Sequence, residues 1–251
     1  MLPLTDHTAA HQRRIADLLR QTEPCVTDVG LGDCSVEFIT RVDAVPLILK
    51  YEWLGNVGKA TTFVGLFSPH RKLYGVACFG FGPGGHIRNH IGSPALCLER
   101  GACVHFAPKN AASYLITRAC RLVYRTTKVS TFFAYGDPSA GEYGGVYQAA
   151  NWLYIGQGIH GKNDRSDRTY MLAPGMDPNI PSNWKTTRVL RQGKRHLSYA
   201  QAEALGWTRA ERPGKHVYAT DIGPKRRAWR KRVVGKPYPA PREGLKRRNL
   251  P

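Results

Sequence analysis

The sequence predicts an α+β protein in which one mixed β-sheet carries helices on both faces. Short alternating or apolar segments, typical of strands, occur at 35–41, 61–67, 72–81, 96–106, 129–136, 152–158 and 167–173. Segments with helical spacing occur at 8–21, 43–55 and 108–126, and a turn leading into a short helix is expected at 137–152. Helices and strands therefore interleave along the chain, while three strands follow one another in the middle, as in a mixed rather than a purely parallel sheet.

The best-defined element is the helix at 108–126. Its apolar side chains recur at three- and four-residue intervals: Ala112, Leu115, Ile116, Ala119, Leu122 and Val123. In the 43–55 helix, Asp43 lies near the cap, Pro46 in the first turn and Gly55 after the end. The glycine-rich stretch 82–94 predicts a loop, so His86 and His90 are expected in solvent rather than together on a metal.

Positive charge is concentrated late in the chain. Of the 37 Lys+Arg and 18 Asp+Glu residues, 19 basic and 4 acidic ones lie in 185–251. We therefore expect a nearly neutral domain at 1–184, which holds the candidate catalytic residues, and a basic nucleic-acid-binding extension at 185–251 with a short helix at 198–207 and a strand at 215–222. Truncation after Trp184 is then expected to weaken DNA binding and flatten its salt dependence. The densest basic run supplies the expected nucleic-acid contacts Lys225, Arg226, Arg227, Arg230, Lys231 and Arg232. The alternative is a solvated tail that aids solubility or subunit contact.

Composition excludes several classes of protein. No run of eighteen apolar residues occurs, which excludes a membrane span, and the first residues form no signal pattern, so a cytoplasmic protein is expected. The cysteines lie in apolar segments without a C-x-x-C pair, which predicts buried, reduced thiols and argues against a zinc site.

Polar groups follow a buried strand in TFFAYGDPSAGEYGGVYQAANWLYIG, residues 131–156. Such groups often line a pocket, so Asp137 is a candidate base and Tyr147 a candidate donor or acid. Tyr135, Gln148 and Asn151 are candidate substrate contacts, since an amide can read a base edge. The alternative is a structural Asx turn at Asp137, with Asn151 as a helix cap.

Two further segments carry weaker signals. In LERGACVHFAPKNAAS, residues 98–113, a strand leads into a helix start that could hold an anion beside Lys109 and Ser113, although an ordinary capped helix explains it as well. In KYEWLG, residues 50–55, Tyr51 or Glu52 could act in acid–base chemistry or stacking, while Trp53 is expected in the core. His105 could face a cleft or solvent.

These segments, in this order and together with KHVYATDIGPKRRAWRK and KPYPAP, resemble the Mom family of phage DNA-modification proteins over roughly residues 35–240. The YGDPSAGEYGGVYQAANW block is the most specific of them. The resemblance implies a fold like the GCN5-related N-acyltransferases, a twisted mixed sheet that splays in its middle. It also implies an enzyme that converts adenine in DNA to an N6-carbamoylmethyl derivative, which hides phage DNA from host restriction endonucleases.

By that resemblance Asp137, Tyr147, Tyr51 and Ser113 are catalytic. Tyr135, Gln148, Asn151, Lys109 and Asn110 are expected to contact the substrates, and double-stranded DNA is the expected partner. Acyltransferases of this kind bind coenzyme A through a glycine-rich loop before the helix, whereas FAPKNAAS has no glycine. A glycyl donor such as an aminoacyl-tRNA therefore fits better than acetyl-CoA.

The resemblance leaves other points open. An iron ion has been considered for the family, and the sequence shows no clean ligand set for it. Glu142 stands where relatives commonly have histidine, and Tyr51 and Glu52 stand where aromatic–histidine pairs are common. Two other functions remain: an acetyl-CoA-dependent N-acetyltransferase of another amine, and a nucleic-acid-binding protein without catalysis.

Overall fold

The structure is a computed structural model of the chain. It describes residues 16, 19–22, 29–52, 54–82, 85–92, 94–138, 141–158, 167–178, 183–192 and 195–239. Of the helix predicted at 8–21, Ala16 and residues 19–22 are described and are helical. Trp53, Cys25 and everything after residue 239 lie outside the described residues, so the predictions that concern them are not addressed.

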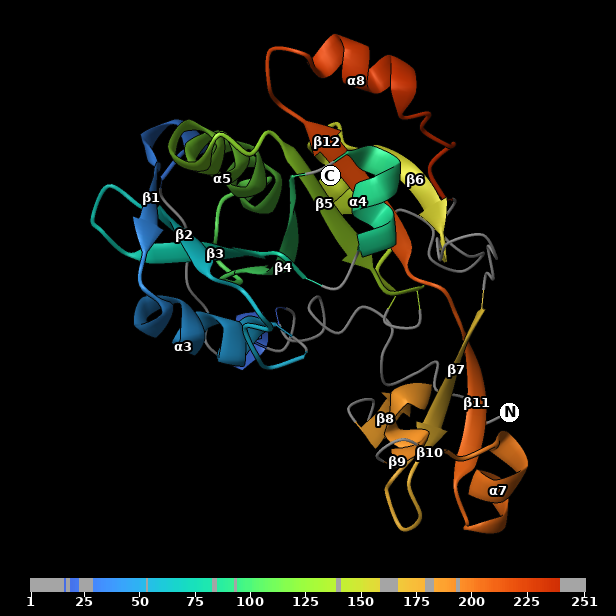
Figure 1. Cartoon of the computed structure of the whole chain (residues 1–251). Helices are drawn as coiled ribbons and strands as arrows, with labels where there is room; N and C mark the ends of the chain where they lie inside the picture. Colours follow the sequence, from blue (N-terminus) through green and yellow to red (C-terminus); the bar gives the residue numbers. More distant parts are fainter. Residues whose placement is uncertain are drawn as a thin grey trace.

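The described strands form a central mixed sheet of seven, a smaller sheet of three and a two-stranded hairpin (Figure 1). The central sheet runs, from one edge to the other, through β1 (Ser35–Ile39), β2 (Thr62–Phe67), β3 (Leu73–Gly80), β4 (Ala95–Cys103), β5 (Thr131–Gly136), β12 (His216–Asp221) and β6 (Leu153–Gln157). Neighbours are antiparallel except β4 and β5, which are parallel. Parallel neighbours need a crossover connection, which is supplied by α5 (Ala111–Thr127).

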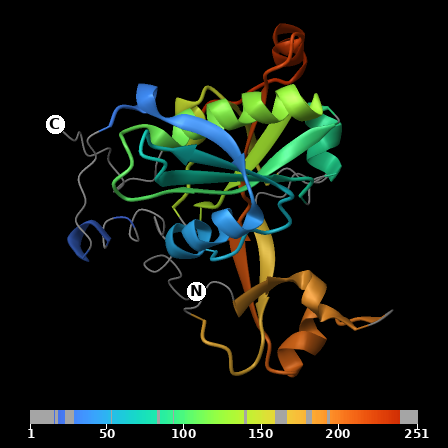
Figure 2. The same ribbon diagram turned by 90° about the vertical axis from the view of Figure 1, so that its left-hand side faces the viewer.

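Helices cover both faces of the central sheet, as predicted. Figure 2 shows α5 on one face and α3 (Arg41–Tyr51) on the other. Helix α5 packs Leu115, Ala119 and Val123 against Phe132 of β5, and it shares this face with the short α6 (Gly145–Ala149). Helix α3 begins at a capping box in which Thr40 and Asp43 satisfy each other's backbone N–H groups.

The sequence analysis did not predict two of the described helices, α4 and α8. The predicted loop at 82–94 contains α4 (Gly85–Ile91), because Ile87 and Ile91, one helical turn apart, are fully buried against the sheet. The basic run contains α8 (Arg226–Arg232), whose single buried side chain is Trp229. Both helices pack into one cluster with Phe133 on the face opposite α5.

The predicted boundary at residue 184 does not separate two structural units. β12 lies between β5 and β6 in the central sheet, although it follows residue 184 by more than thirty positions. The expected extension therefore supplies a fully buried strand of the main domain. Truncation after Trp184 would remove that strand and cannot test DNA binding alone.

The smaller sheet is an insertion between β6 and β12. Its strands are β7 (Asp167–Leu172), β8 (Trp184–Thr186) and β11 (Thr208–Pro213), in the order β11-β7-β8. It also carries the hairpin β9 (Arg191–Gln192) and β10 (Arg195–His196), and α7 (Tyr199–Ala204), which starts at the predicted Ser198 cap. Met171, Leu190 and Ala202 form its own small core. We call residues 167–213 the inserted unit.

Candidate functional site

The strands β4 and β5 stop pairing before either strand ends. Their parallel pairing runs from Ala95 opposite Thr131 to Leu98 opposite Ala134. Beyond that point β4 stays with β3, and the last residues of β5 stay with β12. A register shift leaves Glu99 as an extra residue of β4 at the same place, and such bulges redirect side chains and end pairing. We call this the strand divergence.

Glu52 lies on the β4 side of the strand divergence, immediately after α3. Its carboxylate is almost completely buried, accepts a hydrogen bond from the Leu54 N–H at 2.8 Å and lies 3.8 Å from Nε of Arg100. Burial raises the pKa of Glu52 to about 7, even though Arg100 acts in the opposite direction. Glu52 can therefore take up and release a proton near neutral pH, as a general base must.

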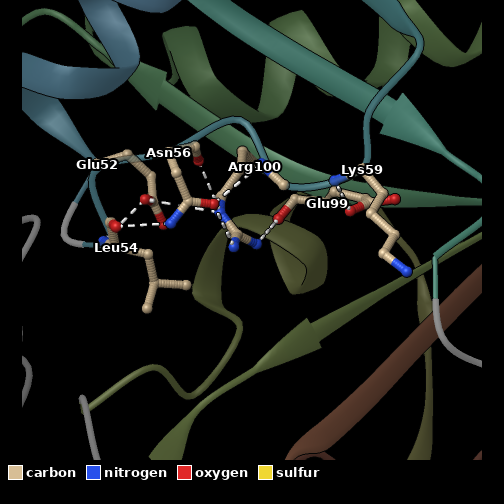
Figure 3. Close-up of polar contacts among 7 residues, drawn as sticks. Glu52, Leu54, Asn56, Lys59, Glu99 and Arg100 are labelled. Carbon is tan, nitrogen blue, oxygen red and sulfur yellow. Dashed lines mark hydrogen bonds and ion pairs between the residues drawn. The ribbon is translucent and has the colours of Figure 1, made fainter. Parts of the chain in front are cut away.

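Arg100 is held in place by the loop that follows α3 (Figure 3). Its Nε donates to the Asn56 backbone carbonyl at 3.0 Å, and its Nη2 donates to Asn56 Oδ1 at 3.1 Å. Neighbouring Glu99 accepts the backbone N–H groups of Lys59 at 2.8 Å and Gly82 at 3.1 Å. Glu99 therefore fixes two loops, while Arg100 fixes the surroundings of Glu52.

Asp137 lies on the β5 side, directly after the strand, as predicted. Its Oδ2 is 3.3 Å from Nζ of Lys215, and its backbone N–H donates to Glu142 Oε2 at 2.9 Å. The Asp137 carbonyl accepts the Glu142 N–H at 3.0 Å, so the two residues close a tight loop. The structure thus places Glu142 next to Asp137, and the Lys215 pairing comes from a residue that is distant in sequence.

Tyr147 of α6 belongs to a group of rings on the α5 face. Its ring centre lies 5.1 Å from that of Tyr218 and 5.3 Å from that of Trp152. Burial raises the pKa of Tyr147 far above its usual range, and the carboxylates of Glu142 and Glu52 add to this effect. Tyr147 is therefore a neutral phenol that can donate a hydrogen bond. Helix α6 follows the loop of Glu142, which hydrogen-bonds to Asp137, so Tyr147 is connected to the Asp137 side of the strand divergence.

The sequence analysis missed His216 as a site residue. It is buried at the start of β12, opposite Gly136, and its Nδ1 is 3.0 Å from the Tyr154 hydroxyl. Burial lowers the pKa of His216, opposed by nearby Asp137, which favours a neutral imidazole. The only signal in the sequence was its place among the rings of the late basic segment; its place beside Asp137 follows from the pairing of β12 with β5.

The three predicted substrate contacts Gln148, Tyr135 and Asn151 lie in three different surroundings. Gln148 donates its amide N–H to the Tyr143 carbonyl at 3.0 Å, which ties down the loop before α6. Tyr135 packs with Phe133 on the sheet face opposite Tyr147. Asn151 has a left-handed backbone (φ 58°), lies in the turn after α6 and lines a cavity away from Asp137. The structure does not bring these three side chains together.

Tyr51, the last residue of α3, forms a buried pair with His105. The Tyr51 hydroxyl and His105 Nδ1 are 2.9 Å apart, and each residue is 6% exposed. His105 therefore faces neither solvent nor an open cleft. Tyr51 belongs to the core cluster of α3, so its hydroxyl is engaged within the protein rather than directed to Asp137.

The start of α5 holds the remaining candidates. The Ser113 hydroxyl donates to the Asn110 carbonyl at 3.0 Å, and Asn110 has a left-handed backbone (φ 68°). Lys109 is exposed beside it. Ser113 thus has a local structural partner, while Lys109 is accessible to a ligand.

The basic residues of α8 lie at the opposite end of the strands from Asp137. β12 runs from His216, opposite Gly136, to Asp221, opposite Thr131, which is about 17 Å at the usual rise of a strand. Trp229 anchors α8 there by donating to the Ile91 carbonyl at 2.7 Å. The side chains Lys225, Arg226, Arg227, Arg230, Lys231 and Arg232 are exposed. A cavity of about 230 Å³ beside α8 is lined by Arg121, Asn151 and Arg226 among others.

Cysteine and metal chemistry have little support in the described part of the chain. Cys34, Cys78, Cys97, Cys103 and Cys120 are free thiols, and burial raises the pKa of each of them. His86 and His90 do share α4, contrary to the predicted loop. However, no group of three or more His, Cys, Asp or Glu side chains among the described residues could hold a metal ion. The described residues therefore do not fit an iron site.

The architecture confirms the predicted α+β class: a mixed sheet with helices on both faces, whose strands β4 and β5 stop pairing in its middle. The described residues contain no helix that is long and apolar enough to cross a membrane. The Mom protein family matches residues 33–239. The chain belongs to the Mom protein family, which confirms the resemblance seen in the sequence.

Solved structures are similar only distantly. Ribosomal-protein-S5-alanine acetyltransferase from Vibrio fischeri is 6% identical with a TM-score of 0.40, over 78% of this chain and 96% of that one. Spermidine N-acetyltransferase from Vibrio cholerae, solved with CoA and spermine, is 8% identical with a TM-score of 0.39, over 76% and 96%. A GNAT family N-acetyltransferase from Escherichia coli, solved with CoA, is 12% identical with a TM-score of 0.36, over 51% and 72%. No curated protein matches the sequence. Likenesses this distant do not assign a ligand or a reaction to this chain.

Proposed function

We propose that this protein is a transferase that modifies adenine N6 in double-stranded DNA to an N6-carbamoylmethyl group and so protects phage DNA from host restriction in the host cytoplasm. The proposal depends chiefly on one observation: in a chain of the Mom family, Asp137 lies at the end of β5 where the strands diverge, paired with Lys215 and joined to Glu142, while the buried carboxylate of Glu52 lies beside Arg100 on the β4 side. A proton acceptor and a hydrogen-bond donor are what transfer to a weakly nucleophilic amine requires.

The adenine must leave the helical stack before its N6 can be reached, at a cost of a few kcal/mol that pocket contacts offset. In our proposal Asp137, held by Lys215, accepts a hydrogen bond from the N6 amine and orients it. The N6 amine attacks the carbonyl carbon of the glycyl ester: the new N–C bond forms, the ester C–O bond breaks and releases the donor's hydroxyl, and Glu52 takes the proton of the broken N–H bond. This step gives N6-glycyl adenine. Attack of its free amine on adenine C6, with loss of the original C6–N bond, then gives the isomeric N6-carbamoylmethyl adenine. Tyr147 donates to the oxygen on which charge develops. Arg100 then stabilises ionised Glu52 after each release of the proton.

The donor is proposed to be a glycyl compound such as an aminoacyl-tRNA. A glycyl group and a carbamoylmethyl group contain the same atoms, so a glycyl donor supplies the composition of the product. The segment before α5 offers Pro108, which lacks an N–H, and no glycine, which makes it a poor cradle for the pyrophosphate of coenzyme A. Heat stabilisation of the protein by coenzyme A would instead favour acetyl-CoA-dependent transfer to another amine.

The experiment is to express the protein in a bacterium, digest the cellular DNA to nucleosides and analyse them by mass spectrometry. We expect a deoxyadenosine heavier by one glycinamide-type group. Fragmentation must then separate N6-carbamoylmethyl from N6-glycyl adenine, because the two have the same mass. Asp137→Ala serves as the inactive control. Unmodified DNA from folded protein supplied with its phage-encoded neighbours would refute the proposal.

A further inference from the structure

The inserted unit leaves the central sheet at the end of the strands that carries Asp137, where β5 finishes. β6 ends at Gln157, β12 begins at His216, and these two residues pair. The Gly158 N–H donates to the Lys215 carbonyl at 3.0 Å, and the Lys215 side chain reaches Asp137. The chain therefore returns from the inserted unit directly into the candidate site.

The inserted unit is an ordered module with its own core. β7 and β11 pair along their full lengths, from Asp167 opposite Pro213 to Leu172 opposite Thr208. Trp184 is buried and donates its indole N–H to the Pro178 carbonyl at 2.8 Å. Figure 1 shows this ribbon extending from the β6–β12 side of the sheet, with α8 at the far end of the molecule. A module of this kind can hold a large partner in a fixed position relative to Asp137.

The charge of the inserted unit suits a polyanion. The inserted unit as a whole contains eight Lys or Arg and four Asp or Glu residues. Its stretch 178–202 has no Asp or Glu, and the basic residues there are Lys185, Arg188, Arg191, Lys194 and Arg195. Lys185 and His196 are exposed. Exposed Arg209 lies over the ring of Tyr199, which is itself 39% exposed, and also pairs with Glu203 at 3.5 Å. The basic sequence includes the β9–β10 hairpin, and a two-stranded ribbon of this kind fits the DNA major groove.

We propose that the inserted unit is the DNA-docking module. It binds the duplex by its phosphates and presents the target adenine to the end of the sheet that carries Asp137. This inference rests on the proposed function, since it takes DNA as the substrate. The basic α8, about the length of β12 away, contributes affinity but does not position the reacting base.

The test compares two variants that remove the same charge. Arg191→Ala with Arg195→Ala changes the inserted unit, and Arg227→Ala with Lys231→Ala changes α8. Each is bound to a mixed-sequence DNA duplex over a range of salt concentrations. The wild-type complex is also photocrosslinked through bromodeoxyuridine, and the attached peptides are identified by mass spectrometry. Melting curves establish that both variants are folded.

We expect crosslinked peptides from residues 183–213. The variant of the inserted unit should bind DNA roughly tenfold more weakly at low salt, with a salt slope smaller by about 1.8, since each lost phosphate contact removes about 0.9. It should also lose modification at saturating DNA, whereas Arg125→Ala, which removes an exposed cation from α5, should keep it. Crosslinks confined to α8, with unchanged binding by the first variant, would overturn the docking assignment. Tighter binding of single-stranded or transfer RNA than of duplex at the inserted unit would overturn it as well.

Failure of this inference is distinguishable from failure of the proposed function. Modified nucleosides in cells together with crosslinks confined to α8 would leave the function intact and refute the docking module. Unmodified DNA together with duplex crosslinked to the inserted unit would leave the docking module intact and refute the chemistry.

Discussion

The two ends of the central sheet differ in the chemistry that they carry. At the end where β5 finishes lie Asp137, Glu142 and the buried rings around Tyr147, and Glu52, at the end of α3, pairs with Arg100 of neighbouring β4. At the other end lies α8, rich in exposed cations and held by the single buried indole of Trp229. The densest positive charge in the sequence is thus not where the candidate chemistry is. We therefore propose that binding strength and base presentation are separable in this fold.

The largest effect should come from Asp137→Ala, at the chemical end. Loss of the group that orients the amine should lower modification of DNA by at least about a hundredfold, the usual scale for a positioned acid–base group. DNA affinity should remain within about twofold, because the basic surfaces are unchanged. Nucleoside mass spectrometry and a binding titration measure the two quantities. Asp33→Ala, at an exposed position elsewhere, is the control, and a parallel fall in affinity would contradict the assignment.

The second prediction concerns Glu52→Gln and its dependence on pH. Wild-type modification should rise as the pH passes about 7, when Glu52 ionises, and the variant should be roughly ten- to a hundredfold slower without that rise. The raised pKa means that the folded state favours protonated Glu52. Ionisation of Glu52 therefore lowers the free energy of unfolding. This loss is complete above pH 7 and absent below the ordinary pKa of 4.5.

The same shift gives a stability measurement that does not depend on activity. As the pH rises from 4.5 to 7, the wild-type protein should lose up to about 3 kcal/mol of its free energy of unfolding relative to Glu52→Gln. Urea titrations at several pH values measure this difference. Glu37→Gln is the matched control, since the hydrogen bond from Arg71 lowers the pKa of that exposed carboxyl. Parallel stability curves for Glu52→Gln and wild type would remove Glu52 as the base.

Local sequence signals predicted much of the central sheet and its main helices. The spacing of apolar residues located α5, and the capping residues located α3 and α7. Helix α4 was missed because glycine and histidine are poor helix formers, and tertiary burial of Ile87 and Ile91 overrides that preference. The boundary at residue 184 failed because charge composition does not reveal that β12 pairs with β5 and β6, whose residues lie far away in sequence.

In the candidate site, too, residues of one local segment could be predicted from the sequence, whereas their distant partners could not. Asp137 and Tyr147 lie in one local block, which made them visible in the sequence. Glu52 acquires its pKa by burial beside Arg100, a residue on another strand, and Lys215 reaches Asp137 only after the long insertion. Asn151 was placed wrongly with the block, because the short α6 carries it to the other end of the sheet. Contacts between distant segments cannot be read from spacing.

A third comparison separates two tyrosines. Tyr147→Phe should slow modification about tenfold or more, since it removes the donor at the strand divergence. Tyr51→Phe should leave the rate within a few-fold and lower the free energy of unfolding by about 1–2 kcal/mol, because the buried hydrogen bond between the Tyr51 hydroxyl and His105 is lost. Initial rates and urea titrations measure both. A rate for Tyr51→Phe as low as that of Tyr147→Phe would return Tyr51 to the catalytic set.

The smallest effect belongs to the α8 end. Arg227→Ala removes one exposed cation from α8, and Arg125→Ala removes one from the exposed side of α5 as the control. If α8 contacts a DNA phosphate, the first variant should reduce the salt slope of binding by about 0.9 and the control should not. Modification at saturating DNA should stay at the wild-type rate in both, because neither cation lies at the end that carries Asp137. A slower rate for Arg227→Ala under saturation would mean that α8 positions the reacting base, and the separation between the two ends of the sheet would no longer hold.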